Sequence, residues 1–337
     1  MMCCFCGQKE IPVDDVRGRQ TSLPRIDCAL LFAPDRDHPE WGPTAMMYRV
    51  KRLLRDALGI DKAGNLLAVR NDDTFIVSYP RSGNTWTRFL IANLLHPEEP
   101  ATFANIEHLV PDAEAQSSRY MRHVPSPRII KAHSYFDPRY RRVVYIVRDP
   151  RDVVLSYYDF SRKYRQIEDK YPLEQYVRDF VTGRLLSSDW GTWGENVASW
   201  VYGRSARPGF LRLRYEDMKT RTENELQRIA DFFDVELTPE HSAAVIRRSS
   251  ANHMRELERA QGKDWVSTKG KRDDIPFVRT AIAGRWKSTL APEAITEIES
   301  AWGNMMAYLG YELVTRKSDV FEPLFAAVAP ERRESGE

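Results

Sequence analysis

The chain has 337 residues, enough for one large domain or two modest ones with a substantial buried core. Its formal net charge is only +2, so nucleic-acid binding through overall charge is not indicated, and nucleic acid is not an expected partner. No apolar run approaches the roughly 18 residues of a membrane span, and the N-terminus lacks the apolar segment of a secretory signal. These features predict a cytoplasmic protein.

Residues 1–70 are predicted to form an irregular N-terminal extension. The chain's four cysteines, Cys3, Cys4, Cys6 and Cys28, all lie there without a histidine at ligand spacing. A disordered, reduced terminus is therefore favoured over a zinc site, and lipid attachment to the first three cysteines is a further alternative.

Residues 46–58 within this extension have apolar side chains at helical spacing, with lysine and arginine on the other faces. This pattern predicts a basic amphipathic helix. Packing of its apolar face on the main domain is favoured. The alternative is weak peripheral contact with an anionic membrane surface.

The stretch from Thr74 to Leu95 is predicted to form a strand, a loop and a helix. Thr74–Tyr79 is rich in β-branched and aromatic residues, the loop Pro80–Gly83 interrupts it, and apolar residues then recur at helical spacing. Such a loop leaves backbone N–H groups free to bind an anion, and Arg81 adds a positive charge. It is not a Walker A loop, because no Gly-Lys-Ser/Thr ends it. A basic turn before an ordinary helix is the alternative.

The polar stretch His96–Val124 is predicted to be loop or short helix. Three further strands follow, over Arg128–His133, Arg142–Val147 and Gly209–Arg214. Helices are predicted from Pro150, over 173–181 and 190–202, from Tyr215 through 233, and over 239–248 and 292–309.

Alternating strands and helices predict an α/β fold with a parallel sheet. Ligands bind such sheets at the carboxyl ends of the strands. This rule gathers one set of polar side chains around a single crevice: Arg81–Thr85, Lys131, His133, Arg148–Arg151 and Tyr215.

Five motifs, in family order, resemble those of the nucleotide-dependent sulfotransferases, close to the cytosolic type and its bacterial relatives. They are Tyr79–Trp86, Lys131–His133, Val147–Ser156, Arg214–Met218 and Pro276–Lys287. The resemblance places a sulfotransferase domain over 71–315 and a polar tail over 316–337. It implies a three-layer, P-loop-like α/β fold with a central, mainly parallel sheet. It also implies 3′-phosphoadenosine 5′-phosphosulfate (PAPS) as sulfuryl donor, and no metal.

The resemblance implies three catalytic residues. His133 would be the general base, Lys131 would stabilise charge on the transferring sulfuryl group, and Arg81 would stabilise the leaving phosphate. The implied donor-binding residues are Arg81, Ser82, Gly83, Asn84, Thr85, Trp86, Arg148, Ser156, Tyr215, Ser249 and Arg279. In this set, the residues from Arg81 to Thr85 would hold the 5′-phosphosulfate. The adenine would lie against Trp86 and Tyr215. The 3′-phosphate would contact Arg148, Ser156 and Arg279.

The chain departs from the family pattern at several places. Ala251 stands where an aromatic residue is expected near the adenine, and the family's short dimer motif is not recognisable after Lys287. Arg81 stands where the cytosolic members usually have lysine. Thr280-Ala281 replaces the usual Lys-Gly after Arg279, which removes one cation near the 3′-phosphate. Arg285 replaces the aspartate of the usual Gly-Asp-Trp segment.

The function predicted is sulfuryl transfer to the hydroxyl group of an alcohol, phenol, sugar or glycolipid. A P-loop kinase or NTPase, and a non-catalytic nucleotide-binding protein of the same fold, are the alternatives. The motifs leave the acceptor and the oligomeric state open.

Overall fold

The computed structural model describes residues 62–64, 67–184, 190–204, 207–279 and 282–315. The predicted helix over 46–58, the four cysteines, Thr280-Ala281 and the polar tail all lie outside these ranges. Within them, no helix has both the length and the apolar character needed to cross a membrane.

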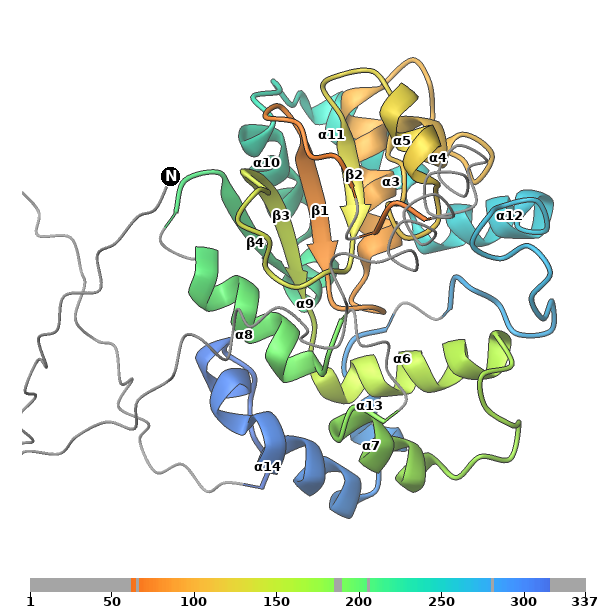
Figure 1. The fold of residues 1–337 in the computed structure, drawn as a ribbon, viewed down its shortest axis with the longest axis vertical. Helices are drawn as coiled ribbons and strands as arrows, with labels where there is room; N and C mark the ends of the chain where they lie inside the picture. Colours follow the sequence, from red (N-terminus) through yellow and green to blue (C-terminus); the bar gives the residue numbers. More distant parts are fainter. Residues whose placement is uncertain (1–61, 65–66, 185–189, 205–206, 280–281, 316–337) are drawn as a thin grey trace, which may run out of the picture. The chain divides into compact units, whose positions relative to one another are not determined.

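A four-stranded parallel sheet forms the centre of the fold. Its strands are β1 (Thr74–Ser78), β2 (Ile129–Ala132), β3 (Arg142–Val147) and β4 (Phe210–Arg214), in the spatial order β2-β1-β3-β4. Thr74 at the start of β1 pairs with the first residue of both neighbouring strands. The strands are therefore in register, and their carboxyl ends share one edge of the sheet (Figure 1).

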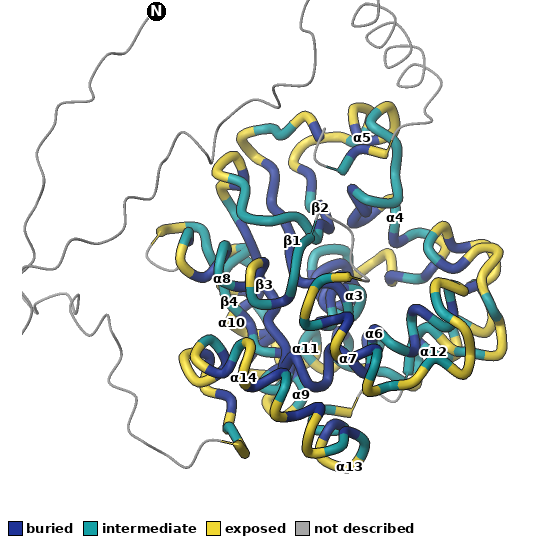
Figure 2. Tube along the Cα trace, turned by 60° about the horizontal axis from the view of Figure 1, so that its bottom comes forward, coloured by how far each residue is buried: buried dark blue, intermediate teal, exposed yellow. Residues whose placement is uncertain are grey.

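Helices cover both faces of this sheet. Phe75 and Val77 of β1 belong to one buried apolar cluster, and Ile76 between them belongs to another, as the alternation of side chains along a strand requires. The strands β1 and β3 are buried almost throughout, which explains their continuous apolar sequences (Figure 2). The three-layer α/β architecture predicted from the sequence is confirmed.

The Ile76 side of the sheet packs against α3 (Asn84–Leu95), α10 (Thr222–Phe232) and α11 (Pro239–Arg248) (Figure 1). The opposite face packs against α6 (Pro150–Lys163), α7 (Leu173–Val181), α8 (Trp193–Arg204) and α14 (Pro292–Tyr308). These bounds lie close to those predicted. At α6, Pro150 occupies the first turn, and the carboxylate of Asp149 accepts a hydrogen bond from the backbone N–H of Arg151.

Some helices differ from the prediction. The helix expected after β4 is divided at Arg221 into α9 (Tyr215–Thr220) and α10, because Arg221 has the extended φ of −134°. The stretch 96–124 contains the short helices α4 (Ile106–Leu109) and α5 (Ser118–His123). Two helices were not predicted, namely α12 (Ala251–Gln261) and α13 (Trp286–Thr289).

Candidate active site

A cavity of about 620 Å³ opens at the carboxyl ends of the strands. The strand order places β2 and β3 on opposite sides of β1, so β1 and β3 flank the switch point at which α/β sheets bind ligands. All the predicted site residues except Ser82 line this cavity, namely Arg81, Gly83, Asn84, Thr85, Trp86, Lys131, His133, Arg148, Ser156, Tyr215, Ser249 and Arg279. The Ser82 side chain is fully buried, and its hydroxyl has no hydrogen-bond partner among the described residues.

The loop between β1 and α3 is held in a tight conformation. Gly83 has φ of +100°, and a Cβ atom there would lie 2.6 Å from Cδ2 of Tyr215, so both the backbone angle and the close aromatic ring require glycine. The amide of Asn84 donates to the carbonyl oxygen of Ile76 and to Oγ of Ser78, each at 3.2 Å. These bonds fix the start of α3, whose first backbone N–H groups have no partner within the helix and whose first three residues line the cavity.

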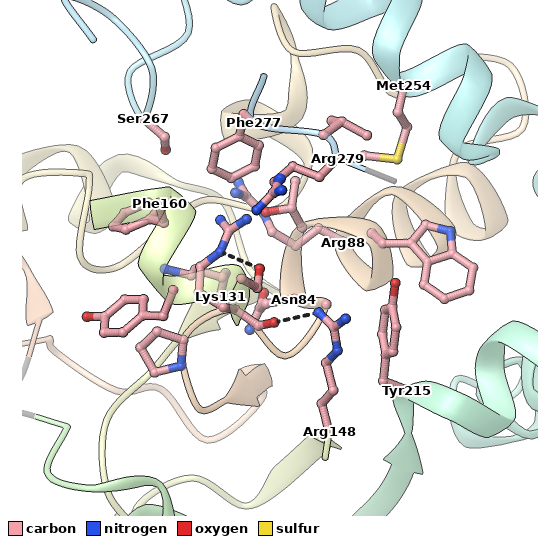
Figure 3. Close-up of a pocket in the computed structure, with 18 of the residues that line it drawn as sticks. Asn84, Arg88, Lys131, Arg148, Phe160, Tyr215, Met254, Ser267, Phe277 and Arg279 are labelled. Atoms are coloured by element: carbon pink, nitrogen blue, oxygen red, sulfur yellow. Dashed lines mark hydrogen bonds between the residues drawn. The ribbon is translucent and has the colours of Figure 1, made fainter. Parts of the chain in front are cut away.

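Arg81 projects from this loop between two aromatic rings. Its guanidinium carbon lies 5.0 Å from the ring centre of Phe160 and 4.9 Å from that of Phe277. Its Nε donates a 3.2 Å hydrogen bond to Oγ of Ser156 on α6 (Figure 3). Burial, with a contribution from the charge of Arg148, lowers the pKa of Arg81 to about 10. The side chain thus keeps its positive charge at neutral pH.

Arg148 follows β3 and makes its hydrogen bonds to neutral groups. Its guanidinium donates to the backbone oxygen of Arg81 at 3.2 Å (Figure 3). It also donates to the backbone oxygen of Ile282 at 3.3 Å. It also lies 4.3 Å from the ring centre of Tyr215, whose ring meets that of Trp86 edge to face. Asp152 is the carboxylate paired with Arg148, at 4.0 Å. This long pair leaves the Arg148 charge poorly compensated.

Lys131, in contrast, is paired with two carboxylates. Its Nζ lies 3.0 Å from Oδ2 of Asp112 and 3.0 Å from Oε2 of Glu114. Burial alone would lower the pKa of Lys131, but these two charges outweigh it and raise the pKa. The other oxygen of Glu114 accepts a 2.6 Å hydrogen bond from the backbone N–H of His133. The Glu114 carboxylate thus contacts both Lys131, near the end of β2, and His133, directly after it.

Sequence reasoning missed Asp112 and Glu114, because they lie in the stretch 96–124 that was read as loop or short helix. The structure pairs this segment with β2, since the backbone N–H of Lys131 donates to the carbonyl oxygen of Pro111 at 2.9 Å. The alternating acidic residues in Asp112-Ala-Glu114 match the alternation of Lys131 and His133. That pattern was the available signal.

The imidazole of His133 is held in one tautomer. Its Nδ1 lies 2.7 Å from the carbonyl oxygen of Ser78, which can only accept, so Nδ1 carries the proton. Nε2, at the opposite edge of the ring, is then unprotonated. Burial, reinforced by the charge of Lys131, lowers the pKa of His133 to about 3. The ring is therefore neutral at physiological pH, and His133 lines the cavity.

Arg279 and Arg285 meet one carboxylate at the far side of the cavity. Nη1 of Arg279 pairs with Oδ2 of Asp159, and Nη1 of Arg285 lies 3.1 Å from the same oxygen. Burial and the charge of Arg285, with smaller effects from Arg81 and Arg148, lower the pKa of Arg279 to about 10.

Helix α12, which was not predicted, anchors the segment that carries Arg279. The carboxylate of Glu258 accepts hydrogen bonds from the backbone N–H groups of Phe277 and Val278, at 2.5 and 2.8 Å. Ser249, just before this helix, accepts a 3.1 Å bond from Asn93 through its Oγ. No group of three or more histidine, cysteine, aspartate or glutamate side chains that could hold a metal ion occurs within the described ranges.

Comparison with known proteins identifies the class of enzyme. Residues 71–310, more than half of the chain, match the family model described as the sulfotransferase domain. The chain therefore belongs to the sulfotransferase family and is an enzyme of the sulfotransferase type. This result decides against the P-loop kinase alternative.

Two curated relatives illustrate the similarity. The 3-beta-hydroxysteroid sulfotransferase of Cavia porcellus is 28% identical over 253 residues, which cover 71% of this chain and 85% of that protein. The amine sulfotransferase of Oryctolagus cuniculus is 26% identical over 238 residues, covering 67% and 77%.

Solved structures agree with the fold. A retinol dehydratase in complex with androsterone and the inactive cofactor PAP matches with a TM-score of 0.60 at 19% identity, covering 77% of this chain and 84% of that one. A mouse sulfotransferase complexed with PAP matches with a TM-score of 0.58 at 20% identity, covering 72% and 86%.

Proposed function

We propose that this enzyme transfers the sulfuryl group of PAPS to the hydroxyl group of an acceptor, with His133 as general base. The observation that carries the proposal is the tautomer of His133. Its Nδ1–H donates to the Ser78 carbonyl, which leaves Nε2 unprotonated, and His133 lines the same cavity as Arg81 and Arg148. A neutral base beside an anion-binding loop is the combination that sulfuryl transfer to a hydroxyl group needs.

In the proposed step, the acceptor oxygen attacks sulfur while the bond from sulfur to the 5′-phosphate oxygen breaks. The hydroxyl proton passes to Nε2 of His133, and the products are a sulfate ester and adenosine 3′,5′-bisphosphate (PAP). Lys131 stabilises charge on the sulfuryl oxygens, and Arg81 stabilises the leaving phosphate. Because arginine stays protonated, we assign Arg81 an electrostatic role and no proton transfer.

The donor would be held by residues from three strand ends. Residues Arg81 to Thr85 are assigned to the 5′-phosphosulfate, and the backbone N–H groups of Gly83, Asn84 and Thr85 at the start of α3 suit it. The backbone N–H of Ser82 already donates to the carbonyl oxygen of Tyr79. The edge-to-face pair of Trp86 and Tyr215 offers aromatic surface for the adenine. The 3′-phosphate is assigned to Arg148, Ser156 and Arg279. Both solved structures described above contain PAP, which supports this choice of nucleotide.

For the acceptor we favour an apolar alcohol or phenol. The ring of Trp190 meets that of His133 edge to face, with centres 5.7 Å apart, so aromatic surface lies beside the base. Tyr157, Phe160 and Tyr164 also line the cavity. The Cavia porcellus relative is named for a hydroxysteroid, and the retinol dehydratase structure contains androsterone. Both names are consistent with this class of acceptor. A sugar or glycolipid acceptor, cytoplasmic location and membrane contact through residues 46–58 stay predictions.

The test is transfer of radiolabelled sulfate from PAPS to a panel of steroid alcohols, simple phenols, sugars and glycolipids, with products identified by mass spectrometry. We expect labelled esters of the apolar alcohols or phenols, and no label when His133→Ala replaces the native enzyme. Failure to label any acceptor, by a protein that binds PAP, would refute the proposed reaction. Labelling of sugars alone would refute only the acceptor class.

A further inference from the structure

Arg285 is a cation of the cavity wall to which the motif comparison gave no role. It lies between Gly284, which has φ of +80°, and the short helix α13. Its side chain lines the same cavity as Arg81, Arg148 and Arg279. It stands where the family usually has aspartate, so the residue reverses the charge expected at this place.

The backbone around Arg285 is fixed to α6 by one carboxylate. Oδ2 of Asp152 accepts a 2.6 Å hydrogen bond from the N–H of Gly284, and Oδ1 accepts a 3.0 Å bond from the N–H of Trp286. The residue between them therefore has a defined position. These bonds engage both oxygens of Asp152, and Arg148 approaches this buried carboxylate only to 4.0 Å.

One face of α6 organises the whole region. Asp152, Ser156 and Asp159 are spaced four and three residues apart, so they project from the same side of the helix. Asp152 holds the Arg285 segment, Ser156 accepts a hydrogen bond from Arg81, and Asp159 pairs with both Arg279 and Arg285. This face thus brings the predicted 3′-phosphate ligands and Arg285 together.

The charges in this region do not balance. Two guanidinium groups share one oxygen of Asp159, and Arg148 adds a third cation with a 4.0 Å pair to Asp152. The effect of Arg285 on Arg279 is visible in the pKa of Arg279, which burial and then the Arg285 charge lower to about 10. A phosphate dianion placed among these side chains would relieve their repulsion and gain charge-assisted hydrogen bonds.

We propose that Arg285 binds the 3′-phosphate of the nucleotide beside Arg279 and so supplies the second cation of that subsite. The inference rests on the proposed function, since it concerns the same donor. It also accounts for the chain's unusual Arg279-Thr280-Ala281 sequence. Arg285, five residues further along the sequence, supplies the positive charge that is absent at Thr280. Asp159 is the positioning residue that keeps the two guanidinium groups on the cavity side of α6.

The test compares two nucleotides that differ only in the 3′-phosphate. Dissociation constants for adenosine 3′,5′-bisphosphate and adenosine 5′-monophosphate are measured by calorimetry on the full chain and on Arg285→Ala. We expect the variant to bind the bisphosphate about tenfold more weakly and the monophosphate within about twofold of the native value. Arg285→Lys should lose about threefold for the bisphosphate only, because it keeps the charge without the planar fork.

Lys287→Ala is the matched control, since it removes a positive charge two residues away that does not line the cavity. It should leave both dissociation constants unchanged. If Arg285→Ala keeps the native preference for the bisphosphate, or weakens both nucleotides equally, the assignment of Arg285 is wrong. If the native chain shows no preference for the bisphosphate, the proposed donor itself is wrong, which is a different result.

Discussion

The two ends of the cavity differ in how far their positive charges are paired with carboxylates. At the lysine–histidine end (Lys131, His133, Asp112 and Glu114), the one cation is paired with two carboxylates at 3.0 Å, and the histidine is neutral. At the arginine end (Arg148, Arg279 and Arg285), two guanidinium groups share one carboxylate oxygen, and the third has only a 4.0 Å pair.

Under the proposed function, this difference separates chemistry from binding. A surplus of fixed cations attracts a phosphate and does nothing for proton transfer. A base must instead be held unprotonated beside groups whose charges are already compensated, so that its lone pair is available. We therefore expect changes at the lysine–histidine end to lower kcat and changes at the arginine end to weaken nucleotide binding.

The largest effect is expected from His133→Ala. Removal of the base should lower kcat by ~10²–10⁴-fold, because the acceptor hydroxyl then has no group positioned to take its proton. The dissociation constant for PAP should stay within about twofold, and its measurement alongside kcat separates the two ends. His123→Ala on α5 is the matched control, since His123 is exposed and outside the cavity. Full activity of His133→Ala would contradict the assigned base.

Arg148→Ala should show the opposite pattern. Loss of a guanidinium that holds a phosphate is expected to weaken PAP binding by about 30-fold or more, while kcat at saturating donor falls much less. Calorimetry with PAP gives the first value and steady-state kinetics the second. The matched control is Arg139→Ala, which removes a half-exposed arginine paired with Asp137 away from the cavity. Unchanged PAP affinity in Arg148→Ala would rule out its assignment to the 3′-phosphate.

A smaller effect is expected from Glu114→Ala, compared with Asp112→Ala. Both carboxylates pair with Lys131, but only Glu114 also accepts the backbone N–H of His133. Glu114→Ala should therefore lower kcat by about tenfold and Asp112→Ala by only about threefold, with PAP affinity unchanged in both. Equal losses in the two variants would show that the bond to the His133 backbone has no part in positioning the base.

The sequence could predict the parts of this site that follow a strand. Arg81, His133 and Arg148 come shortly after the buried strands β1, β2 and β3, and Tyr215 comes directly after the half-buried strand β4. Parallel strands bring such positions to one edge. The partners on irregular segments escaped prediction. Glu114 meets His133 only because residues 111–113 pair with β2, and Arg285 meets Asp159 only because Asp152 fixes the backbone beside it. Long-range contacts of this kind leave no periodic pattern in the sequence.

The α12 helix escaped prediction for a related reason. Its residues are mostly polar, and among them only Met254 is buried, so the apolar stripe that identifies an amphipathic helix is nearly absent. Its start was nevertheless readable, since Ser250 caps the helix by accepting a hydrogen bond from the backbone N–H of His253. In this segment a capping residue was a better signal than hydrophobic periodicity.

The smallest expected effect concerns pH. His133 must be unprotonated to act as base, and in the enzyme without nucleotide its pKa of about 3 keeps it so throughout pH 5–8. The negative charges of bound PAPS raise this pKa, but a pKa of up to about 5 still leaves kcat at pH 5 within about twofold of its maximum. At saturating PAPS, kcat should therefore change by less than about twofold over this range. A histidine with the ordinary pKa of about 6.5 would be mostly protonated at pH 5, and kcat would fall by about 30-fold. Saturating donor keeps the ionisation of the 3′-phosphate, near pH 6, out of the measurement.

The same lowered pKa fixes the sign of a stability change. Because the unfolded chain would bind a proton at His133 near pH 6.5 and the folded chain only near pH 3, acid favours unfolding between these values. The melting temperature of the native enzyme should thus fall more steeply below pH 6.5 than that of His133→Ala. A flat kcat with this stability difference would establish that His133 is neutral in the folded enzyme. An acid limb in kcat near pH 6.5, with no stability difference, would show instead that its base is an ordinary solvated histidine, and the contrast between the two ends would then rest on the arginines alone.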